Sequence, residues 1–240
     1  MKKSYLNWSS GKDAAFALYK IRQEGIYSVE KLITTINSEV DRISMHGVRR
    51  ELLESQAKLI GLPIDLIYLN GNVPLLEYNE VMRKQTDLLL SQGYRYSIFG
   101  DIFLEDLKRY REEQLERVGI KAVFPLWKLD TRDLMHDFIS AGFKAIIVCV
   151  NSKLLDKSFC GRIIDEDFLS SLPPGVDPCG ENGEFHTFVY DGPIFSHPVK
   201  FHVGEVVEKY YQPSKEENDC FQEKKETWDT AFWYCDLIPI

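Results

Sequence analysis

Apolar residues recur along the first 150 residues with two alternating patterns, short continuous runs and stretches with a period of about 3.6 residues. The short runs predict buried strands at 5–8, 32–36, 64–68, 96–99 and 145–150. Helical spacing predicts helices at about 13–23, 47–60, 74–92, 103–118 and 131–140. This alternation is typical of an α/β fold with a doubly wound, mostly parallel sheet. The unbroken run Ala145–Val150 is the kind expected in the centre of that sheet.

Ligands bind such a sheet at the carboxyl ends of its strands. Three polar segments follow predicted strands, at 9–13, 37–47 and 100–101. We therefore expect these three segments to share one edge of the sheet.

The pattern changes after Val150, where strand-like segments and a loop replace the alternation. A period of two predicts a strand at 199–207, and 233–240 is expected to return as a closing strand. Residues 212–230 are polar and charged, which predicts a solvated loop or a mobile excursion. The sequence thus predicts a doubly wound domain at 1–150 and a smaller α+β domain at 151–240.

Composition and charge narrow the class of protein. With 240 residues and 44% apolar residues, the chain can bury a full core. No apolar run approaches the ~20 residues of a membrane helix, and the start does not resemble a signal peptide, so a cytoplasmic location is expected. The net charge of −8 and the absence of a basic cluster argue against nucleic acid as a partner. The five cysteines include no CxxC pair and are expected to be reduced thiols.

The segment Ser9, Ser10, Gly11, Lys12 and Asp13 lies between the first predicted strand and helix. A turn of small residues at a helix start exposes backbone N–H groups and partial positive charge, which suits phosphate. The segment matches neither a Walker A loop nor a dinucleotide fingerprint. The alternative is an ordinary turn in which Ser9 or Ser10 caps the helix.

SSGKDA at 9–14 resembles the SGGxDS loop of the PP-loop ATP pyrophosphatases, with Ser10 at a position that is usually glycine and Ala14 at one that is usually serine. Further segments occur in the order and spacing of the diphthine-ammonia ligase-like branch of that superfamily. They are TTINSEVDRISMHG at 34–47, FGDI at 99–102, FPLWKLDT at 124–131 and CGENGEFHTFVYDGPIF at 179–195. GENGEFHT is close to GEGGEFET and is the most specific element of the resemblance.

The resemblance implies a ligase that uses ATP to adenylate a carboxylate and lets ammonia attack the acyl-adenylate, releasing AMP and pyrophosphate. The acceptor carboxylate is either diphthine on elongation factor 2 or an unknown small molecule, and assembly as a homodimer stays open. The helix at 104–116 differs from the YQR-type helix of the family. Substrate contacts made by that family helix are therefore not carried over.

The same resemblance assigns the nucleotide to the first domain. Ser9, Ser10, Gly11, Lys12 and Asp13 are expected to hold the leaving pyrophosphate, with Lys12 neutralising its charge and Mg²⁺ bridging phosphate oxygens. His46 is expected against the nucleotide, with a solvent-facing loop histidine as the alternative. Gly100 is expected to let the backbone approach a phosphate. Asp13 and Asp101 are expected near the metal, with a helix-terminal charge and a helix N-cap as their respective alternatives.

The second domain is expected to hold the acceptor near CGENGEFHT. Gly180 and Gly183 permit tight backbone turns, while Glu181 and Glu184 offer carboxylates that could bind a cation or deprotonate ammonium. An acidic turn before a strand is the alternative for both. His186 follows on a strand as a further substrate-binding residue. Cys179 is interpreted as a structural thiol and not as a nucleophile.

Two other functions use the same residues. A nucleotide-binding sensor without turnover is favoured by the absence of a hydroxyl at Ala14. A tRNA-modifying PP-loop enzyme is disfavoured by the acidic charge. AMP formation would exclude the sensor, and retention on tRNA would favour the tRNA-modifying enzyme.

Overall fold

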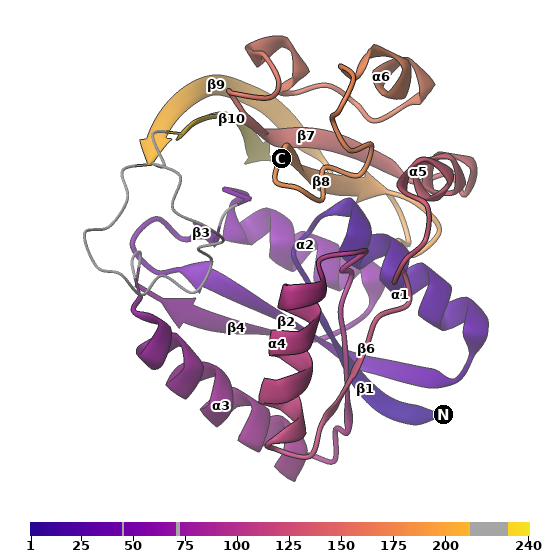
Figure 1. The fold of residues 1–240 in the computed structure, drawn as a ribbon, viewed down its shortest axis with the longest axis vertical. Coiled ribbons are helices and arrows are strands. Elements are labelled where there is room, and N and C mark those ends of the chain that lie inside the picture. The colour runs from indigo at the N-terminus through magenta and orange to yellow at the C-terminus, as the bar shows by residue number, and fades with distance from the viewer. Residues whose placement is uncertain (45, 71–72, 212–229) are drawn as a thin grey trace.

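The chain folds around two sheets, with helices between them and on their outer sides (Figure 1). The structure is a computed structural model and describes residues 1–44, 46–70, 73–211 and 230–240. The first sheet contains β1 (Lys2–Asn7), β2 (Tyr27–Asn37), β3 (Arg42–Ile43), β4 (Ile64–Leu69), β5 (Tyr96–Ile98) and β6 (Lys121–Val123). The second sheet contains β7 (Lys144–Asn151), β8 (Phe185–Asp191), β9 (Phe201–Tyr211) and β10 (Thr230–Pro239).

The first sheet is parallel apart from β3. β1 lies in its middle, with β2 and β4 on one side and β5 and β6 on the other. The short β3 pairs antiparallel with the end of β2. The connecting helices are α1 (Lys12–Glu24), α2 (Arg50–Ile60), α3 (Leu75–Ser91) and α4 (Glu105–Glu116). The predicted doubly wound sheet is confirmed, and the segments after β1, β2 and β5 share its carboxyl edge.

The two faces of this sheet are covered by different layers, because neighbouring side chains of a strand point to opposite faces. Tyr5 of β1 packs in a cluster with Leu89 of α3 and Leu115 of α4. Leu6 belongs instead to a larger core cluster, which includes Phe16 of α1 and extends into the second sheet. The larger core is therefore continuous between the two sheets.

Helix α1 lies inside this continuous core and leads into the candidate site. Its alanines are almost completely buried, and small side chains allow neighbouring elements to approach closely. The helix ends at Gly25, whose left-handed φ of 66° closes the last turn. The beginning of α1 is consequently held by packing along the whole helix.

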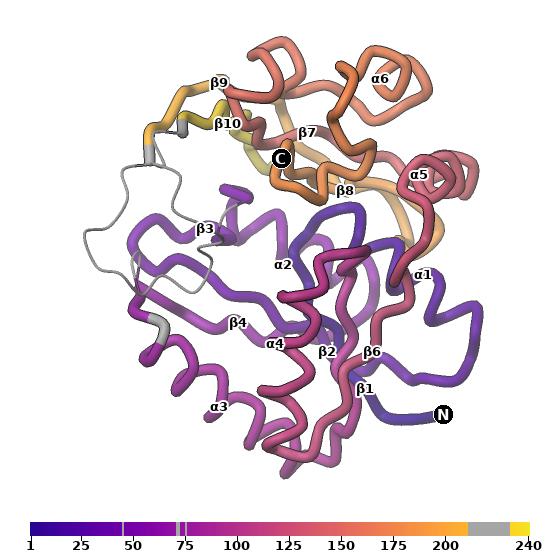
Figure 2. Tube along the Cα trace, in the orientation of Figure 1, coloured from indigo at the N-terminus to yellow at the C-terminus, as the bar shows by residue number. Residues whose placement is uncertain are grey.

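The second sheet is antiparallel and has the order β8, β7, β10, β9. The chain reaches it through α5 (Thr131–Ser140), which follows β6 (Figure 2). A short 3-10 helix (Lys157–Phe159) and α6 (Glu166–Ser171) lie between β7 and β8. The predicted strands at 199–207 and 233–240 are confirmed as β9 and β10.

The expectation that Ala145–Val150 lies in the centre of the parallel sheet is wrong. This run is β7, which pairs antiparallel with β8 and β10. Its side chains are buried on both faces of the sheet. An unbroken apolar run indicates such burial, but it does not indicate whether the strand pairs parallel or antiparallel with its neighbours. The last strand of the parallel sheet is instead β6, whose three residues are too few to give a periodic signal.

The five predicted helices are present as α1 to α5. No helix in the described part of the chain is long and apolar enough to cross a membrane. Four cysteines are buried free thiols, as predicted: Cys149, Cys160, Cys179 and Cys235. Cys220 and the predicted excursion at 212–230, apart from the residue that opens β10, lie outside the described residues.

Candidate active site

The segment between β1 and α1 is the centre of the candidate site. Gly11 is the N-cap of α1, so the alternative that Ser9 or Ser10 is the cap is wrong. Ser9 Oγ accepts a hydrogen bond from the Gly11 amide at 3.4 Å. Ser10 has a φ of 69°, in the left-handed region that glycine adopts readily. This conformation gives a physical reason why glycine is usual at this position of the loop that 9–14 resembles.

Strand β8 of the second sheet lies along this segment. Thr187 Oγ1 accepts a hydrogen bond from the Lys12 amide at 3.0 Å. The Ser10 carbonyl accepts one from the Val189 amide at 3.0 Å. A Cβ atom on Gly11 would lie 3.3 Å from both the carbonyl oxygen and Oγ1 of Thr187. The close approach of β8 therefore favours glycine at position 11.

Gln56 of α2 completes the contact between the segment and β8. Its Nε2 donates to the carbonyls of Ser10 at 3.1 Å and Val189 at 2.6 Å, and its Oε1 accepts from Trp8 Nε1 at 2.9 Å. Sequence reasoning did not single out Gln56. The available signal was a lone glutamine on the apolar face of α2, whose other buried residues are Leu52, Leu53, Ala57 and Ile60.

Lys12 and Asp13 form an ion pair at the start of α1. Lys12 Nζ lies 2.6 Å from Asp13 Oδ1 and 2.8 Å from Oδ2. The Lys12 side chain is 3% exposed and that of Asp13 is 28% exposed. Burial alone would lower the pKa of Lys12, but the charge and hydrogen bond of Asp13, together with the nearby Cys179 and Glu181, outweigh burial and raise this pKa. Lys12 is therefore a buried, permanent cation, and Asp13 is the more accessible partner.

The carboxyl end of β5 approaches this ion pair. A Cβ atom on Gly100 would lie 2.8 Å from the Asp13 carbonyl carbon and 2.9 Å from the Ala14 amide nitrogen. Gly100 thus lets the backbone after β5 press against the first turn of α1. Asp101 does not cap the next helix, because Leu104 is the N-cap of α4.

Asp101 is instead paired with a cation from α4. Arg111 Nη1 donates to Asp101 Oδ2 at 2.6 Å, and its guanidinium lies 4.5 Å from the centre of the Phe99 ring. Burial raises the pKa of Asp101, and Arg111 opposes this rise. Arg111 was not predicted as a site residue, and its position on α4 gives that helix a contact with the site.

The loop between α6 and β8 brings Glu181 to the same place. Glu181 Oε1 accepts a hydrogen bond from the Ile102 amide at 2.9 Å. Burial, followed by the negative charges of Asp13 and Asp101, raises the pKa of Glu181 to about 7. Three carboxylates from three separate segments therefore surround the start of α1.

The second predicted carboxylate of this loop has a different environment. Glu184 is 2% exposed, and its Oε1 accepts hydrogen bonds from the Asp177 amide at 2.9 Å and Asn182 Nδ2 at 3.2 Å. Gly180 and Gly183 have left-handed φ values of 68° and 85°, which allow the tight turn around these contacts. Glu184 therefore holds the loop together, whereas Glu181 faces the other carboxylates.

His46 and His186 form a stacked pair beside Gly11. Their ring centres are 4.5 Å apart with an interplanar angle of 28°, and His46 Cε1 would lie 3.2 Å from a Cβ atom on Gly11. Burial, followed by the adjacent His186, keeps the pKa of His46 well below its usual value. Burial lowers the pKa of His186 to about 4. Both rings are neutral at pH 7, and the half-buried His46 packs against Gly11 of the loop.

Cys179 lies close to this centre but is not arranged as a nucleophile. Its thiol donates to the Thr131 carbonyl at 3.4 Å, and burial raises its pKa. Because a nucleophilic cysteine requires a lowered pKa, this environment supports the interpretation of Cys179 as a structural thiol.

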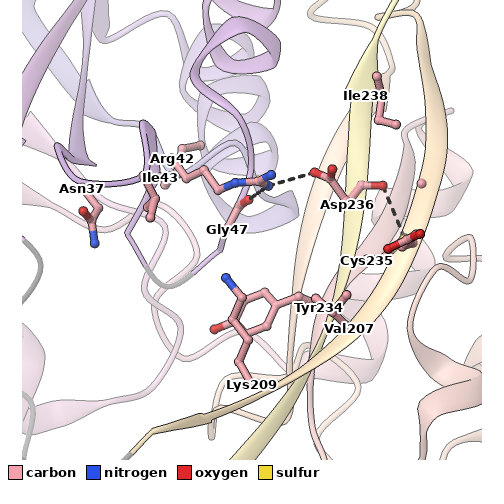
Figure 3. A pocket seen from close by; sticks show the side chains of 13 residues that line it. Asn37, Arg42, Ile43, Gly47, Val207, Lys209, Tyr234, Cys235, Asp236 and Ile238 are labelled. Atoms are coloured by element: carbon pink, nitrogen blue, oxygen red, sulfur yellow. Dashed lines mark hydrogen bonds and ion pairs between the residues drawn. The ribbon is translucent and has the colours of Figure 1, made fainter.

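A pocket of about 560 Å³ lies on the other side of the turn that carries His46. Its walls come from the end of β2, from β3 and from the β9–β10 hairpin (Figure 3). Arg42 Nη1 reaches Asp236 Oδ1 at 2.8 Å, and Lys209 Nζ lies 5.5 Å from the centre of the Tyr234 ring. A Cβ atom on Gly47 would be only 2.9 Å from that ring. The turn is therefore packed between the second sheet and the β1–α1 segment.

Comparisons with known proteins cover almost the whole chain. A family model described as the diphthamide synthase N-terminal domain matches residues 1–122, and one described as the diphthamide synthase C-terminal domain matches residues 130–236. A diphthine–ammonia ligase of Rattus norvegicus is 32% identical over 222 residues, which are 83% of this chain and 82% of the relative. A diphthine–ammonia ligase of Schizosaccharomyces pombe is 25% identical over 222 residues, and the match spans only 36% of its length.

A solved structure is also similar over part of the chain. It is described as a predicted subunit of tRNA methyltransferase from Methanocaldococcus jannaschii. The alignment covers 60% of this chain and 77% of the other, with a TM-score of 0.42 and 19% identity.

Proposed function

Because the chain belongs to the diphthamide synthase family, we propose that it is an ATP-dependent amide ligase. In the proposed reaction, a carboxylate oxygen attacks the α-phosphorus of ATP, and the bond to pyrophosphate breaks. Ammonia then attacks the carbonyl carbon of the acyl-adenylate, and AMP leaves. The products are an amide, AMP, pyrophosphate and one proton.

The observation that carries this proposal is the meeting of three carboxylates and a buried lysine at the start of α1. In the proposed complex, Ser9, Ser10 and Gly11 line the pyrophosphate end of ATP, where the start of a helix favours negative charge. Lys12 supplies a fixed positive charge beneath them. The orphaned Ser10 Oγ, which is buried without a partner among the described residues, marks an unsatisfied polar group in this loop. His46 and Gly100 complete the expected nucleotide surroundings, and His186, which stacks on His46, remains a proposed substrate-binding residue.

Glu181 is the proposed general base for ammonia transfer. Ammonium must lose a proton before its nitrogen can attack a carbonyl, and a base is most effective when its pKa lies near the working pH. A pKa of about 7 for Glu181 suits this task. Glu184, with its loop hydrogen bonds, is assigned to positioning the turn between Gly180 and Gly183.

The proposed reaction also uses Mg²⁺. The described residues contain no group of three or more side chains that could hold a metal ion by themselves. Mg²⁺ usually takes one or two carboxylates and completes its shell with substrate phosphates and water, which suits Asp13 and Asp101. When bound there, the ion would offset the charge that develops on the leaving pyrophosphate.

The acceptor is proposed to be a carboxylate held near the 179–184 loop. Diphthine is the first acceptor to test, because the relatives are named diphthine–ammonia ligases. A small-molecule carboxylate is the second. Both reach the same reacting atoms, so the reaction type is independent of the choice.

The test is incubation of the purified protein with ATP, Mg²⁺ and ammonium, with diphthine-bearing elongation factor 2 or a metabolite extract as acceptor source. The expected products are AMP and pyrophosphate, formed only with an acceptor and lost in Lys12→Ala. ADP would contradict the proposal. ATP binding without AMP formation under any of these conditions would favour the sensor, and retention on tRNA would favour the tRNA-modifying enzyme.

A further inference from the structure

Gln56 is completely buried where β1, α2, β8 and the segment Ser9–Asp13 meet. It has no part in the proposed chemistry. We propose that Gln56 is a positioning residue that sets the shape of this segment for nucleotide binding. The inference rests on the proposed binding of ATP by Ser9–Asp13. It concerns a residue of α2 whose amide touches the backbone of the segment and none of the reacting groups.

The three partners of Gln56 determine the orientation of its amide. The indole nitrogen of Trp8 can only donate, so Oε1 must face it. The carbonyls of Ser10 and Val189 can only accept, so Nε2 must face both. The site therefore requires a neutral side chain of this length, with an acceptor at one end and two donors at the other. Glutamine is the residue that meets this requirement.

The effect on the loop is transmitted through one carbonyl group. The Ser10 carbonyl accepts hydrogen bonds from Gln56 Nε2 and from the Val189 amide. These two bonds hold the peptide that joins Ser10 to Gly11, and they oppose relaxation of Ser10 from its φ of 69°. The direction of the next amide, that of Lys12, is set by Thr187 Oγ1. Loss of the Gln56 contact should therefore change the loop while leaving α2 and β8 in place.

Position 56 can be tested with two replacements of similar size, one ionisable and one neutral. Gln56→Glu places an oxygen against two carbonyls when the side chain is ionised, and protonation restores one donor. Gln56→Met removes both donors at every pH. Direct titration of ATP onto each purified variant, across a pH range and without acceptor, measures the effect on the loop alone. Each dissociation constant is divided by that of the unchanged protein at the same pH.

Both variants are expected to bind ATP roughly 10- to 100-fold more weakly near neutral pH, as when a residue that orients a binding group is lost. The defect of Gln56→Glu should diminish as the pH falls, whereas the defect of Gln56→Met should not. Leu89→Ala on α3 is the matched control, because Leu89 belongs to the core cluster on the other face of the first sheet, which contains no residue of the loop, and a cavity there lowers stability. Its ATP affinity should equal that of the unchanged protein.

Each outcome addresses one proposal. Absence of ATP binding by the unchanged protein would overturn the proposed function. ATP binding by the unchanged protein with equal affinity in a folded Gln56→Met variant would overturn the positioning role. If Gln56→Glu does not fold, Gln56→Met alone decides the question, because it introduces no buried charge.

Discussion

The amide of Ile102 donates a hydrogen bond to the Glu181 carboxylate at 2.9 Å, across 79 residues of sequence. This bond joins the carboxyl end of β5 to the loop that precedes β8. It brings Glu181 to Asp13 and Asp101. Burial, followed by the charges of these two carboxylates, raises the pKa of Glu181, although the Ile102 bond itself lowers it. The reactivity proposed for Glu181 is therefore a property of the assembled fold and not of its own loop.

Replacement of Glu181 should separate the two half-reactions. In Glu181→Gln, we expect adenylation to persist, as measured by the exchange of labelled pyrophosphate into ATP. Ammonia transfer should fall by roughly 100- to 10,000-fold, the usual contribution of a general base. Hydroxylamine, which is already neutral at pH 7, should restore product formation. Equal rates with ammonia in the variant and the unchanged protein would remove Glu181 from the mechanism.

Glu181 should also make stability depend on pH. Its pKa is 4.5 ordinarily and about 7 in the folded protein. Between these values the folded state holds a proton that the unfolded state has lost, so stability decreases as pH rises, and the full cost is present above pH 7. Glu181→Gln should therefore be more stable than the unchanged protein at pH 8, by about 2 kcal/mol after allowance for partial exposure.

Denaturant unfolding of both proteins at pH 4 and pH 8 measures this difference. The two should have similar stability at pH 4, where the carboxyl is protonated in both states. Comparison of the two proteins cancels the opposite contributions of His46 and His186, whose lowered pKa values make stability rise with pH. A constant difference at both pH values would contradict the assignment.

Ser10→Gly should stabilise the protein. The substitution relieves a left-handed φ of 69° and removes a hydroxyl that is buried without a partner among the described residues. The expected net gain is about 1 kcal/mol after the entropic cost of glycine. Thermal unfolding should show this as a rise of roughly 2–4 °C in Tm. Ser10→Ala is the matched control and should gain less, because it removes the hydroxyl and keeps the backbone strain.

Gly100→Ala should disturb the first turn of α1. The new methyl group would be 2.8 Å from the Asp13 backbone, and such overpacking typically costs about 1–3 kcal/mol. We expect lower stability together with weaker ATP binding. Gly119→Ala provides a control, because a Cβ atom there meets nothing within 4 Å and only the φ of 75° is unfavourable. That control should lose stability without losing ATP affinity.

The carboxyl edge of the first sheet could be predicted because the amphipathic alternation of strands and helices determines which loops meet. That logic placed Ser9–Asp13, His46 and Gly100 together, and the contacts of Gly11 and Gly100 confirm their proximity. The same reasoning gave the wrong sheet for β7, because a strand that is buried on both faces has the same apolar sequence pattern in a parallel and in an antiparallel sheet. The strand that completes the parallel sheet, β6, was too short to be detected.

Two features of the site depend on contacts between distant segments. Glu181 and Glu184 lie three residues apart in one loop, and only the packing of that loop against Ile102 directs one carboxylate to the site and the other to its own turn. Gln56 is an ordinary helix residue by propensity. Its role depends on carbonyls contributed by segments 46 and 133 residues away.

The position of β10 has a consequence for synthesis of the chain on the ribosome. β10 is synthesised after β7, β8 and β9, yet it lies between β7 and β9 and pairs with both. Until it arrives, β7 has one unpaired edge, and exposed edges of apolar strands promote association between nascent chains. Correct assembly of this half should therefore wait until β10 has left the ribosome, and a chain that stalls before residue 230 should be a preferred client of chaperones.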